Sequence, residues 1–378
     1  MRIGFDAKRL FCNFTGLGNY SRSLLRNLHE FHPGNEYYLY TPEISRNAET
    51  EYFADKKAFN TIVPDTSLKS LWRSFTIKNQ LKKDNPDLYH GLSHELPFGI
   101  KKTGIRTIVT IHDLIFKHYP ETYPRTDRFI YNYKFSYSCD VADKIVAISE
   151  STKSDIINFY NIPEEKIEVI YQSCNPLFYK LQDQEVNDRI CKEYQLPDNY
   201  LLYVGSIEAR KNLKCLIRSY AALNAGIRMP LVLVGKGGKY KQETHRIVHE
   251  LGLQKDVIWI DRLHDNRHLQ SVYQNAHAMI YPSLFEGFGL PVTEALLCKT
   301  PVITSSCSAM PEAGGPDSMY FDPGSHEQLT ICLEKVISDT ELRTKMITKG
   351  YEYAMTTFSP EILSGKMLRL YQNISGKI

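Results

Sequence analysis

The sequence lacks the signatures of several large enzyme classes. It contains no G-x-x-x-x-G-K-[ST] loop, no G-x-S-x-G elbow and no Asp-x-Asp pair. These absences disfavour P-loop nucleotide hydrolases, α/β-hydrolases and a carboxylate clamp for a divalent metal on a diphosphate. The eight cysteines are scattered, with no C-x-x-C pair. They predict reduced thiols and no metal site.

Long apolar runs and an excess of one charge are also missing. The N-terminus has no signal-peptide core, and no run of 18 apolar residues occurs. We therefore expect a cytoplasmic protein that at most adheres to the cytosolic face of the inner membrane. Lys and Arg number 46 against 43 Asp and Glu, a net charge of only +3. This balance argues against nucleic acid as a partner, because phosphate backbones require concentrated positive charge.

Length and hydrophobic pattern predict two α/β domains. A chain of 378 residues exceeds the usual size of one hydrophobic core. Short β-branched and aromatic runs alternate with stretches of helical spacing, which is typical of parallel sheets with crossover helices. Prolines and polar residues near 175–199 interrupt the pattern, so we expect domains over 1–180 and 181–359, with a terminal helix at about 360–378. The expected strands are 2–5, 36–40, 107–111, 144–148, 168–171, 200–204, 231–234, 257–260, 278–281, 302–304 and 319–321.

The stretch 281–305, YPSLFEGFGLPVTEALLCKTPVITS, is the most informative part of the chain. Gly287 and Gly289 permit a loop backbone to approach a ligand closely. Pro291 suits the first turn of a helix, which we expect to run to about Cys298. Free amides at a helix N-terminus bind anions, so the stretch predicts a phosphorylated ligand.

Two glutamates, Glu286 and Glu294, enclose this glycine loop. Both could direct carboxylates at ligand hydroxyls. In the alternative interpretation Glu294 only complements the helix dipole and Glu286 is solvated.

A pair of cations follows another expected strand. In YVGSIEARKN, Gly205 ends the strand, and Arg210 and Lys211 follow a short loop. An Arg grips a phosphate with a planar fork, and a Lys adds a point charge. In the alternative interpretation these residues form the solvated first turn of a helix and bind no ligand.

The loop between the first strand and the first helix contains Gly16 and Gly18. Ser21 stands where a dinucleotide fingerprint would have its third glycine, and the GKGGK run at 235–239 is also incomplete. Neither run predicts NAD binding. The loop itself is compatible with a simple turn or with ligand contact.

Histidines provide two further candidates. His112 ends the apolar run TIVTIHD, where it could donate a hydrogen bond to a substrate hydroxyl or cap the next turn. His90 and His94 have i, i+4 spacing, but Gly91 and Pro97 argue against the helix that a zinc site of that kind needs.

Taken in order, these motifs resemble the retaining glycosyltransferases of family 4. The resemblance covers nearly the whole chain and implies the GT-B fold, with two facing Rossmann-like domains, parallel sheets and a C-terminal helix that crosses back to the first domain. The motifs that carry it are TGLGNYSRSLL, IHDL, AISESTKSDI, VGSIEARKN, YPSLFEGFGLPVTEAL, SAMPEAGG and FSPEIL.

The resemblance also implies roles for residues of the second half. Arg210 and Lys211 would hold the donor diphosphate, and Glu294 would accept hydrogen bonds from the ribose hydroxyls. Glu286 would contact the transferred sugar. The remaining donor contacts would come from Gly205, Gly287, Phe288, Gly289 and Leu290, of which the last three would supply backbone amides.

In the first half, the resemblance implies that Gly16 and Gly18 make room for the diphosphate and the acceptor, and that His112 contacts the sugar near the reacting carbon. The run VIYQSCNPLFY stands where many relatives have Asn-Gly-Val-Asp. The residues that contact the acceptor are therefore where this sequence departs from the family pattern.

The expected activity is metal-independent transfer of a hexose, with retention, to a hydroxyl of a glycan or lipid-linked acceptor. The resemblance to bacterial mannosyltransferases of surface polysaccharide synthesis favours GDP-mannose as co-substrate, with no other cofactor. UDP-glucose, UDP-N-acetylglucosamine and dTDP-rhamnose remain alternatives. A non-catalytic sugar-nucleotide-binding protein and an NAD-dependent oxidoreductase are the alternatives of other classes.

The segment Ser67 to Lys83 mixes leucines and aromatic residues with lysines and arginine. It could lie on anionic lipid beside a lipid-linked acceptor. The interpretation favoured by the sequence is an amphipathic helix packed on the first sheet.

Overall fold

Two compact units divide the chain, and each is described separately. The structure is a computed structural model that describes residues 1–54 and 57–377. The first unit comprises Met1–Ser173 with Phe358–Ile378, and the second comprises Cys174–Thr357. The division after Ser173 falls a few residues before the boundary expected at 180. The terminal segment groups with the first unit, as the fold resemblance implies.

A seven-stranded sheet forms the centre of the first unit, and every neighbouring pair of strands is parallel. The order β3-β2-β1-β4-β5-β6-β7 changes direction at β1, which is the pattern of a doubly wound sheet. In register, Ile3 of β1 lies opposite Tyr37 on one side and Leu88 on the other. The strands are β1 (Arg2–Asp6), β2 (Glu36–Tyr40), β3 (Phe59–Ile62), β4 (Leu88–Gly91), β5 (Arg106–Ile111), β6 (Lys144–Ala147) and β7 (Ile167–Val169).

Two strands of this sheet, β3 and β4, were not expected from the sequence. β4 is the central strand between β1 and β5, and all four of its residues are buried. Its sequence, LYHG, contains a histidine and a glycine and lacks the apolar run that would indicate a buried strand. Backbone pairing on both sides gives this segment its strand conformation. The buried ring of His90 is tolerated because its two nitrogens are hydrogen-bonded to the hydroxyls of Tyr371 and Thr110.

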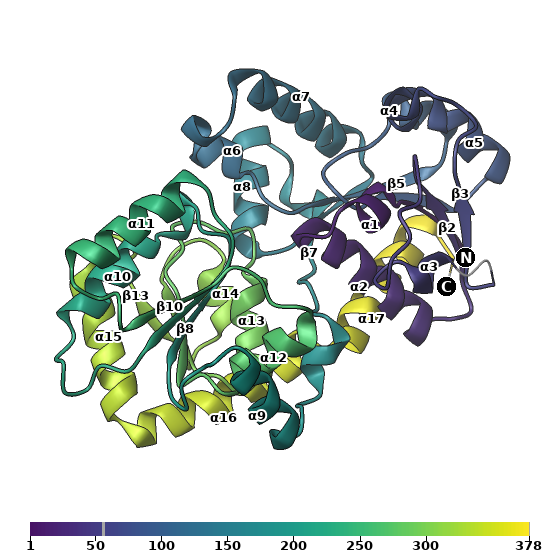
Figure 1. Ribbon diagram of the computed structural model, residues 1–378. Coiled ribbons are helices and arrows are strands. Elements are labelled where there is room, and N and C mark those ends of the chain that lie inside the picture. The colour runs from purple at the N-terminus through teal and green to yellow at the C-terminus, as the bar shows by residue number, and fades with distance from the viewer. Residues whose placement is uncertain (55–56, 378) are drawn as a thin grey trace. The chain divides into compact units, whose positions relative to one another are not determined.

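Helices cover the faces of this sheet (Figure 1). The last helix, α17, packs against α2, and its buried residues include Leu363, Met367 and Tyr371. Within the described residues, no helix combines the length and the apolarity needed to cross a membrane. The helices are α1 (Lys8–Cys12), α2 (Gly16–Phe31), α3 (Glu51–Ala54), α4 (Lys69–Leu71), the π-helix η1 (Trp72–Thr76), α5 (Ile77–Asp84), α6 (Ile115–His118), α7 (Arg125–Val141), α8 (Glu150–Tyr160) and α17 (Pro360–Ser375), with 3-10 turns η2 (Ile100–Thr103), η3 (Pro120–Thr122) and η4 (Glu164–Lys166).

The second unit is built on a six-stranded parallel sheet in the order β10-β9-β8-β11-β12-β13. The runs LLYV of β8 and LVLV of β9 are buried throughout, as expected for strands with helices on both faces. All six strands coincide with runs expected from the sequence, to within one residue at each end. They are β8 (Leu201–Val204), β9 (Leu231–Val234), β10 (Val257–Ile260), β11 (Ala278–Tyr281), β12 (Val302–Ser305) and β13 (Met319–Phe321).

The order reverses between β8 and β11, so the loops after these two neighbouring strands open at one edge of the sheet. Ligands of doubly wound sheets bind at this kind of position. The helices of the unit are α9 (Gln184–Glu193), α10 (Leu213–Ala222), α11 (Lys239–Glu250), α12 (Asn266–Gln274), α13 (Leu290–Leu297), α14 (Met310–Gly314), α15 (His326–Ser338) and α16 (Thr340–Thr357), with 3-10 turns η5 (Pro176–Tyr179) and η6 (Ala209–Lys211).

Candidate active site

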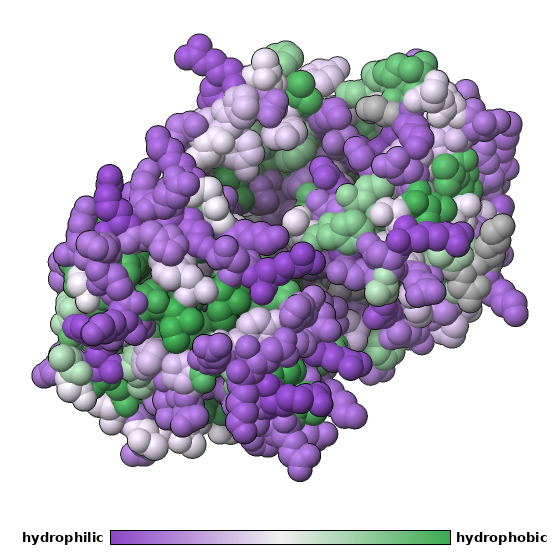
Figure 2. Space-filling view, viewed as in Figure 1, coloured by the Kyte–Doolittle hydropathy of each residue, from purple (hydrophilic) through white to green (hydrophobic). Residues whose placement is uncertain are grey.

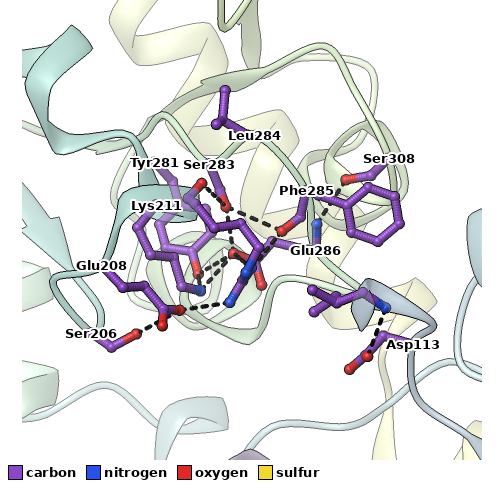
Figure 3. Close-up of polar contacts among 12 residues, drawn as sticks. Asp113, Ser206, Glu208, Lys211, Tyr281, Ser283, Leu284, Phe285, Glu286 and Ser308 are labelled. Carbon is purple, nitrogen blue, oxygen red and sulfur yellow. Dashed lines mark hydrogen bonds and ion pairs between the residues drawn. The ribbon is translucent and has the colours of Figure 1, made fainter. Parts of the chain in front are cut away.

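The loops after β8 and β11 meet at the carboxyl edge of the second sheet. The backbone amide of Leu284 donates to the carbonyl of Arg210 at 2.8 Å, which ties the two loops together. The short turn η6 carries Arg210 and Lys211, whose side chains reach Glu286 in the second loop. Figure 3 shows Lys211 beside Glu286. Two motifs that lie far apart in the sequence therefore form one site.

Glu286 is contacted by four side chains at a single carboxylate oxygen, Oε1, and the Tyr281 hydroxyl is the most distant of them at 3.3 Å. Lys211 Nζ lies 2.5 Å from it, Arg210 Nη1 lies 2.9 Å from it, and Ser283 Oγ donates at 2.5 Å. The residue is 9% exposed, so these bonds form largely away from water. The two cations predicted to hold a diphosphate are thus held by a carboxylate of the protein.

A second layer of contacts fixes this cluster. The hydroxyl of Tyr281 accepts from Lys211 Nζ at 2.6 Å, and the amide of Glu286 donates to Ser308 Oγ at 3.0 Å. Ser305 Oγ donates to the carbonyl of Ser283 at 2.6 Å. These supporting residues received no role from the sequence, although Tyr281 and Ser283 lie within the motif that pointed to the site.

The charges of the cluster balance. Burial alone would raise the pKa of Glu286, but Lys211 and Arg210 outweigh it and lower the pKa below its ordinary value. Glu208 supplies a second carboxylate, whose Oε1 lies 2.7 Å from Arg210 Nη2. Two cations and two carboxylates therefore form a compact network, and Glu208 is a member that the sequence did not single out.

Glu294 occupies a different environment, on helix α13. Its Oε2 accepts a hydrogen bond from the buried Tyr273 hydroxyl at 3.2 Å. Burial raises the pKa of Glu294 to about 8, and the bond from Tyr273 opposes this rise only in part. At neutral pH this carboxyl group is therefore mostly protonated.

Helix α13 begins where the glycine loop ends, one residue before the predicted Pro291 start. Gly289 is its N-cap and has a φ of +117°, a conformation that favours glycine. A Cβ at this position would lie 2.5 Å from Met310 Cε. The loop that contains Gly287 and Phe288 therefore passes close to α14 before it enters the helix.

Gly205 lies directly after β8, where the sequence predicted it. Its amide donates to the carbonyl of Val234 at 3.0 Å, which continues the pairing of β8 with β9 by one residue. The turn toward Arg210 starts from this point.

In the first unit, His112 is a buried side chain at the end of β5. Its Nε2 lies 2.8 Å from the carbonyl of Leu92, and because a carbonyl only accepts, Nε2 carries the proton. Burial lowers the pKa of His112 to about 4, so the ring is neutral at neutral pH. The remaining nitrogen, Nδ1, is an acceptor. The donor role toward a substrate hydroxyl that the sequence suggested for this histidine does not fit this tautomer.

Gly16 and Gly18 lie in the first turn of α2, and they differ in their surroundings. A Cβ on Gly18 would lie 1.7 Å from the carbonyl oxygen of Asn13, whereas a Cβ on Gly16 would meet nothing within 4 Å. Asn13 Oδ1 also accepts from the Gly18 amide at 3.0 Å. Gly18 is thus required by the chain itself, while the surface at Gly16 is open.

His90 and His94 are core residues. His90 Nδ1 lies 2.7 Å from the hydroxyl of Tyr371, and His94 stacks on Phe135 with ring centroids 4.3 Å apart. Among the described residues, no group of three or more His, Cys, Asp or Glu side chains gathers as a metal site.

Models of glycosyltransferase families match both halves of the chain. A model of glycosyltransferase family 4 matches residues 14–176, and a model of glycosyl transferases group 1 matches residues 187–353. The two matches fall on the first and second units and together span most of the chain.

The chain belongs to glycosyltransferase family 4.

Curated relatives of this glycosyltransferase include bacterial enzymes of O-antigen synthesis. O-antigen chain mannosyltransferase B of Escherichia coli is 28% identical over 387 aligned residues, which cover 98% of this chain and 100% of the relative. The serotype-specific mannosyltransferase WbdA of Escherichia coli is 26% identical over 75% of this chain, but that match covers 36% of WbdA.

Solved structures show the same GT-B fold as this glycosyltransferase. The Anabaena protein HepE, solved in complex with UDP, has a TM-score of 0.77 and 15% identity, with 99% of this chain and 100% of HepE covered. A glycosyltransferase from Rickettsia africae has a TM-score of 0.76 and 18% identity, with 98% of each chain covered. The expected pair of Rossmann-like domains with parallel sheets is confirmed.

Proposed function

We propose that this glycosyltransferase moves mannose from GDP-mannose to a hydroxyl of a growing glycan or lipid-linked acceptor in the cytoplasm. One observation carries the proposal: Arg210 and Lys211 converge on Glu286 at the edge of a doubly wound sheet. The choice of mannose is supported by the 28% identity with an O-antigen mannosyltransferase over 98% of the chain.

The cation pair would hold the donor diphosphate. Arg210 and Lys211 are already paired with Glu286 and Glu208, so the diphosphate must take over contacts that carboxylates make in the free protein. An exchange of this kind keeps both cations paired with negative charge, while Glu286 retains the hydrogen bonds from the hydroxyls of Ser283 and Tyr281. Donor binding is thus a replacement of counter-ions within an existing network.

Glu286 would then turn toward the transferred sugar. The contacts that hold it reach Oε1, and within the described part of the chain none is made to Oε2. Oε2 is therefore the oxygen that can accept from sugar hydroxyls. The backbone amides of Phe288, Gly289 and Leu290 at the start of α13 would face negative charge on the donor.

Glu294 would accept hydrogen bonds from the ribose hydroxyls. Accepting two such bonds favours the ionised carboxylate over the protonated form. The pKa of Glu294 is about 8 in the free protein, so nucleotide binding would release a proton at neutral pH.

The chemistry we propose is front-face transfer with retention at the anomeric carbon. As the bond to the leaving diphosphate breaks, negative charge grows on its oxygens, and Arg210, Lys211 and the loop amides stabilise it. A phosphate oxygen of the leaving group would accept the proton of the attacking hydroxyl. These cations would supply the charge that a divalent metal supplies in other transferases.

In the first unit, His112 would assist as an acceptor. Its Nδ1 is unprotonated, so it can accept a hydrogen bond from a sugar hydroxyl but cannot donate one. A Gln at this position, whose amide can still offer an acceptor, is the conservative variant for testing the contact. Gly16 and the start of α2 would face the acceptor side.

The direct test is a donor panel. Binding of GDP-mannose, UDP-glucose, UDP-N-acetylglucosamine and dTDP-rhamnose is measured by thermal shift, and transfer is measured with mannose oligosaccharides. We expect GDP-mannose to give the largest shift and the only efficient transfer. Preference for another donor would overturn the choice of mannose but leave glycosyl transfer intact.

The same donor panel distinguishes a glycosyltransferase from a non-catalytic sugar-nucleotide-binding protein. A protein that binds one sugar nucleotide tightly, but transfers its sugar to none of a broad set of acceptors and does not hydrolyse it, would be a sugar-nucleotide-binding protein. Arg210→Ala should abolish the thermal shift in both cases, so only the transfer assay separates them.

A further inference from the structure

One face of the first unit exposes an unusual number of large apolar side chains. Of the thirteen large hydrophobic residues exposed in the described part of the chain, six lie in two segments, one from the N-cap of α4 to η1 and the other in the first half of α7. Leu68 is 62% exposed and Phe129 is 74% exposed, so these side chains project well beyond the core. We call these six the apolar face: Leu68, Leu71 and Phe75 at α4 and η1, and Phe129, Ile130 and Tyr133 on α7.

The two segments form one continuous surface. The ring of Phe98 stacks on Phe75 with centroids 5.2 Å apart and lies 5.7 Å from the ring of Tyr133. A row of three aromatic rings therefore joins η1 to α7. Figure 2 shows hydrophobic surface over both α4 and α7.

The segment α4–η1, which carries three of these six side chains, is anchored to the core of the first unit. Trp72, Ile77 and Leu81 are buried, which agrees with the internal packing that the sequence favoured for part of Ser67 to Lys83. Arg73 reaches Asp6 at the end of β1 with an N–O distance of 2.5 Å. The exposed side chains are thus presented by an anchored element.

Positive charge surrounds the apolar face. The stretches 63–83, 99–106 and 125–134 contain eleven Lys and Arg residues and two Asp residues. Four of these cations are already in ion pairs with carboxylates: Arg73, Lys134, Lys69 and Arg106. The other seven leave this side of the first unit with an excess of positive charge. Lys78 lies beside Gly99, next to the bridging ring of Phe98, because its Nζ would be 2.9 Å from a Cβ on Gly99. Lys101 and Lys102 follow on η2 and are exposed.

We propose that this face docks on an anionic phospholipid surface. Aliphatic and aromatic side chains enter the boundary between headgroups and acyl chains, while flanking lysines contact anionic headgroups. A second copy of the chain fits less well, because a two-fold dimer would set the same positive stretches against each other. The proposal does not depend on which sugar nucleotide the second unit binds.

Vesicle co-sedimentation tests the proposal. The full chain is mixed with vesicles of phosphatidylcholine alone or of phosphatidylcholine with phosphatidylglycerol. We expect binding only to the anionic vesicles, with loss at high salt. Phe75→Ser with Phe129→Ser should weaken this binding by at least about tenfold, because each ring otherwise leaves water.

The charge variant removes the lysines of η2. Lys101→Gln with Lys102→Gln should weaken binding about fivefold per lysine, the effect of one cation near an anionic bilayer. Matched controls alter exposed residues of the second unit. They are Leu251→Ser with Ile331→Ser, and Lys192→Gln with Lys255→Gln, and all should bind as the unaltered protein does.

Several outcomes would overturn the proposal. One is no binding to anionic vesicles, and another is equal binding by the surface variants and their controls. A dimer in analytical ultracentrifugation that Phe75→Ser with Phe129→Ser dissociates would assign the face to self-association instead. Transfer to a soluble acceptor should be unchanged in every variant, which separates this test from that of the proposed function.

Discussion

The loop after β11 and the helix α13 each carry one glutamate of the same motif, and the two carboxylates differ in charge state. Glu286 lies beside Lys211 and Arg210, which lower its pKa. Glu294 accepts a hydrogen bond from the neutral hydroxyl of Tyr273, and burial raises its pKa to about 8. Two glutamates separated by seven residues are thus set to opposite charge states by their neighbours.

This difference separates two tasks within the proposed donor site. An ionised Glu286 can hold two cations ready and accept from sugar hydroxyls throughout the physiological pH range. A protonated Glu294 must lose its proton before it accepts fully from a ribose. Variants that alter one carboxylate and not the other can therefore test the division of roles.

The largest effect is expected from removing Arg210 and Lys211, the cations that lower the pKa of Glu286. Arg210→Ala with Lys211→Ala should lower kcat/KM by about a thousandfold or more, because two charge-assisted contacts to the leaving diphosphate are lost. The double variant also leaves Glu286 buried without a partner, which destabilises the fold. Steady-state transfer assays measure the effect.

A triple variant controls for that instability. Adding Glu286→Gln to the double variant removes the unpaired charge, and circular dichroism checks that the protein is folded. Transfer within about tenfold of the unaltered rate in either protein would show that these cations do not stabilise the leaving group.

Glu286→Gln should have the next largest effect. We expect kcat to fall by about a hundredfold, because the sugar loses a charged acceptor. Binding of GDP should not weaken, since Arg210 and Lys211 are freed from their carboxylate partner. Calorimetric titration with GDP, alongside transfer kinetics, measures the two effects. Loss of GDP affinity in this variant would contradict the counter-ion exchange.

Glu294→Gln should change the pH dependence of binding. In the unaltered protein, GDP affinity should rise with pH up to about 8 and then level off, because the ionised carboxylate accepts better from ribose. Gln cannot ionise, so its affinity should stay flat and lie about tenfold below the plateau. Fluorescence or calorimetric titrations across this range measure it. A pH profile that the substitution leaves unchanged would remove Glu294 from the ribose site.

Glu294→Gln should also change how the free energy of unfolding depends on pH. The folded-state pKa of Glu294 lies above its ordinary 4.5, so the folded protein binds the proton more tightly than the unfolded chain. This group therefore makes the free energy of unfolding decrease as pH rises from about 4.5 to about 8. In Glu294→Gln that part of the slope should disappear from denaturant titrations.

Tyr273→Phe should give the smallest effect. The tyrosine hydroxyl donates to Glu294 and lowers its pKa, so its removal should raise the pKa further. We expect the midpoint of the GDP-binding profile to move upward by less than about one pH unit. A downward shift would mean that the hydroxyl does not stabilise the ionised carboxylate.

The sequence predicted strands correctly where the local run was entirely apolar. All six strands of the second sheet were expected, since runs such as LVLV of β9 have few alternatives. It missed β3 and β4, because LYHG of β4 acquires its strand conformation from pairing with β1 and β5. The sequence predicted Arg210, Lys211 and Glu286 as site residues but gave no indication that they bond to one another.

By itself, the sequence determined that the chain forms two parallel α/β units and that a glycine loop, a cation pair and two glutamates lie after strands. These features depend on hydrophobic periodicity and on motif order, which are local properties. Only the tertiary structure decided the charge states of Glu286 and Glu294, the tautomer of His112 and the joining of Phe75 to Tyr133. The physical reason is that pKa values, tautomers and surfaces depend on which groups lie within a few ångströms, and residues far apart in the chain supply those neighbours.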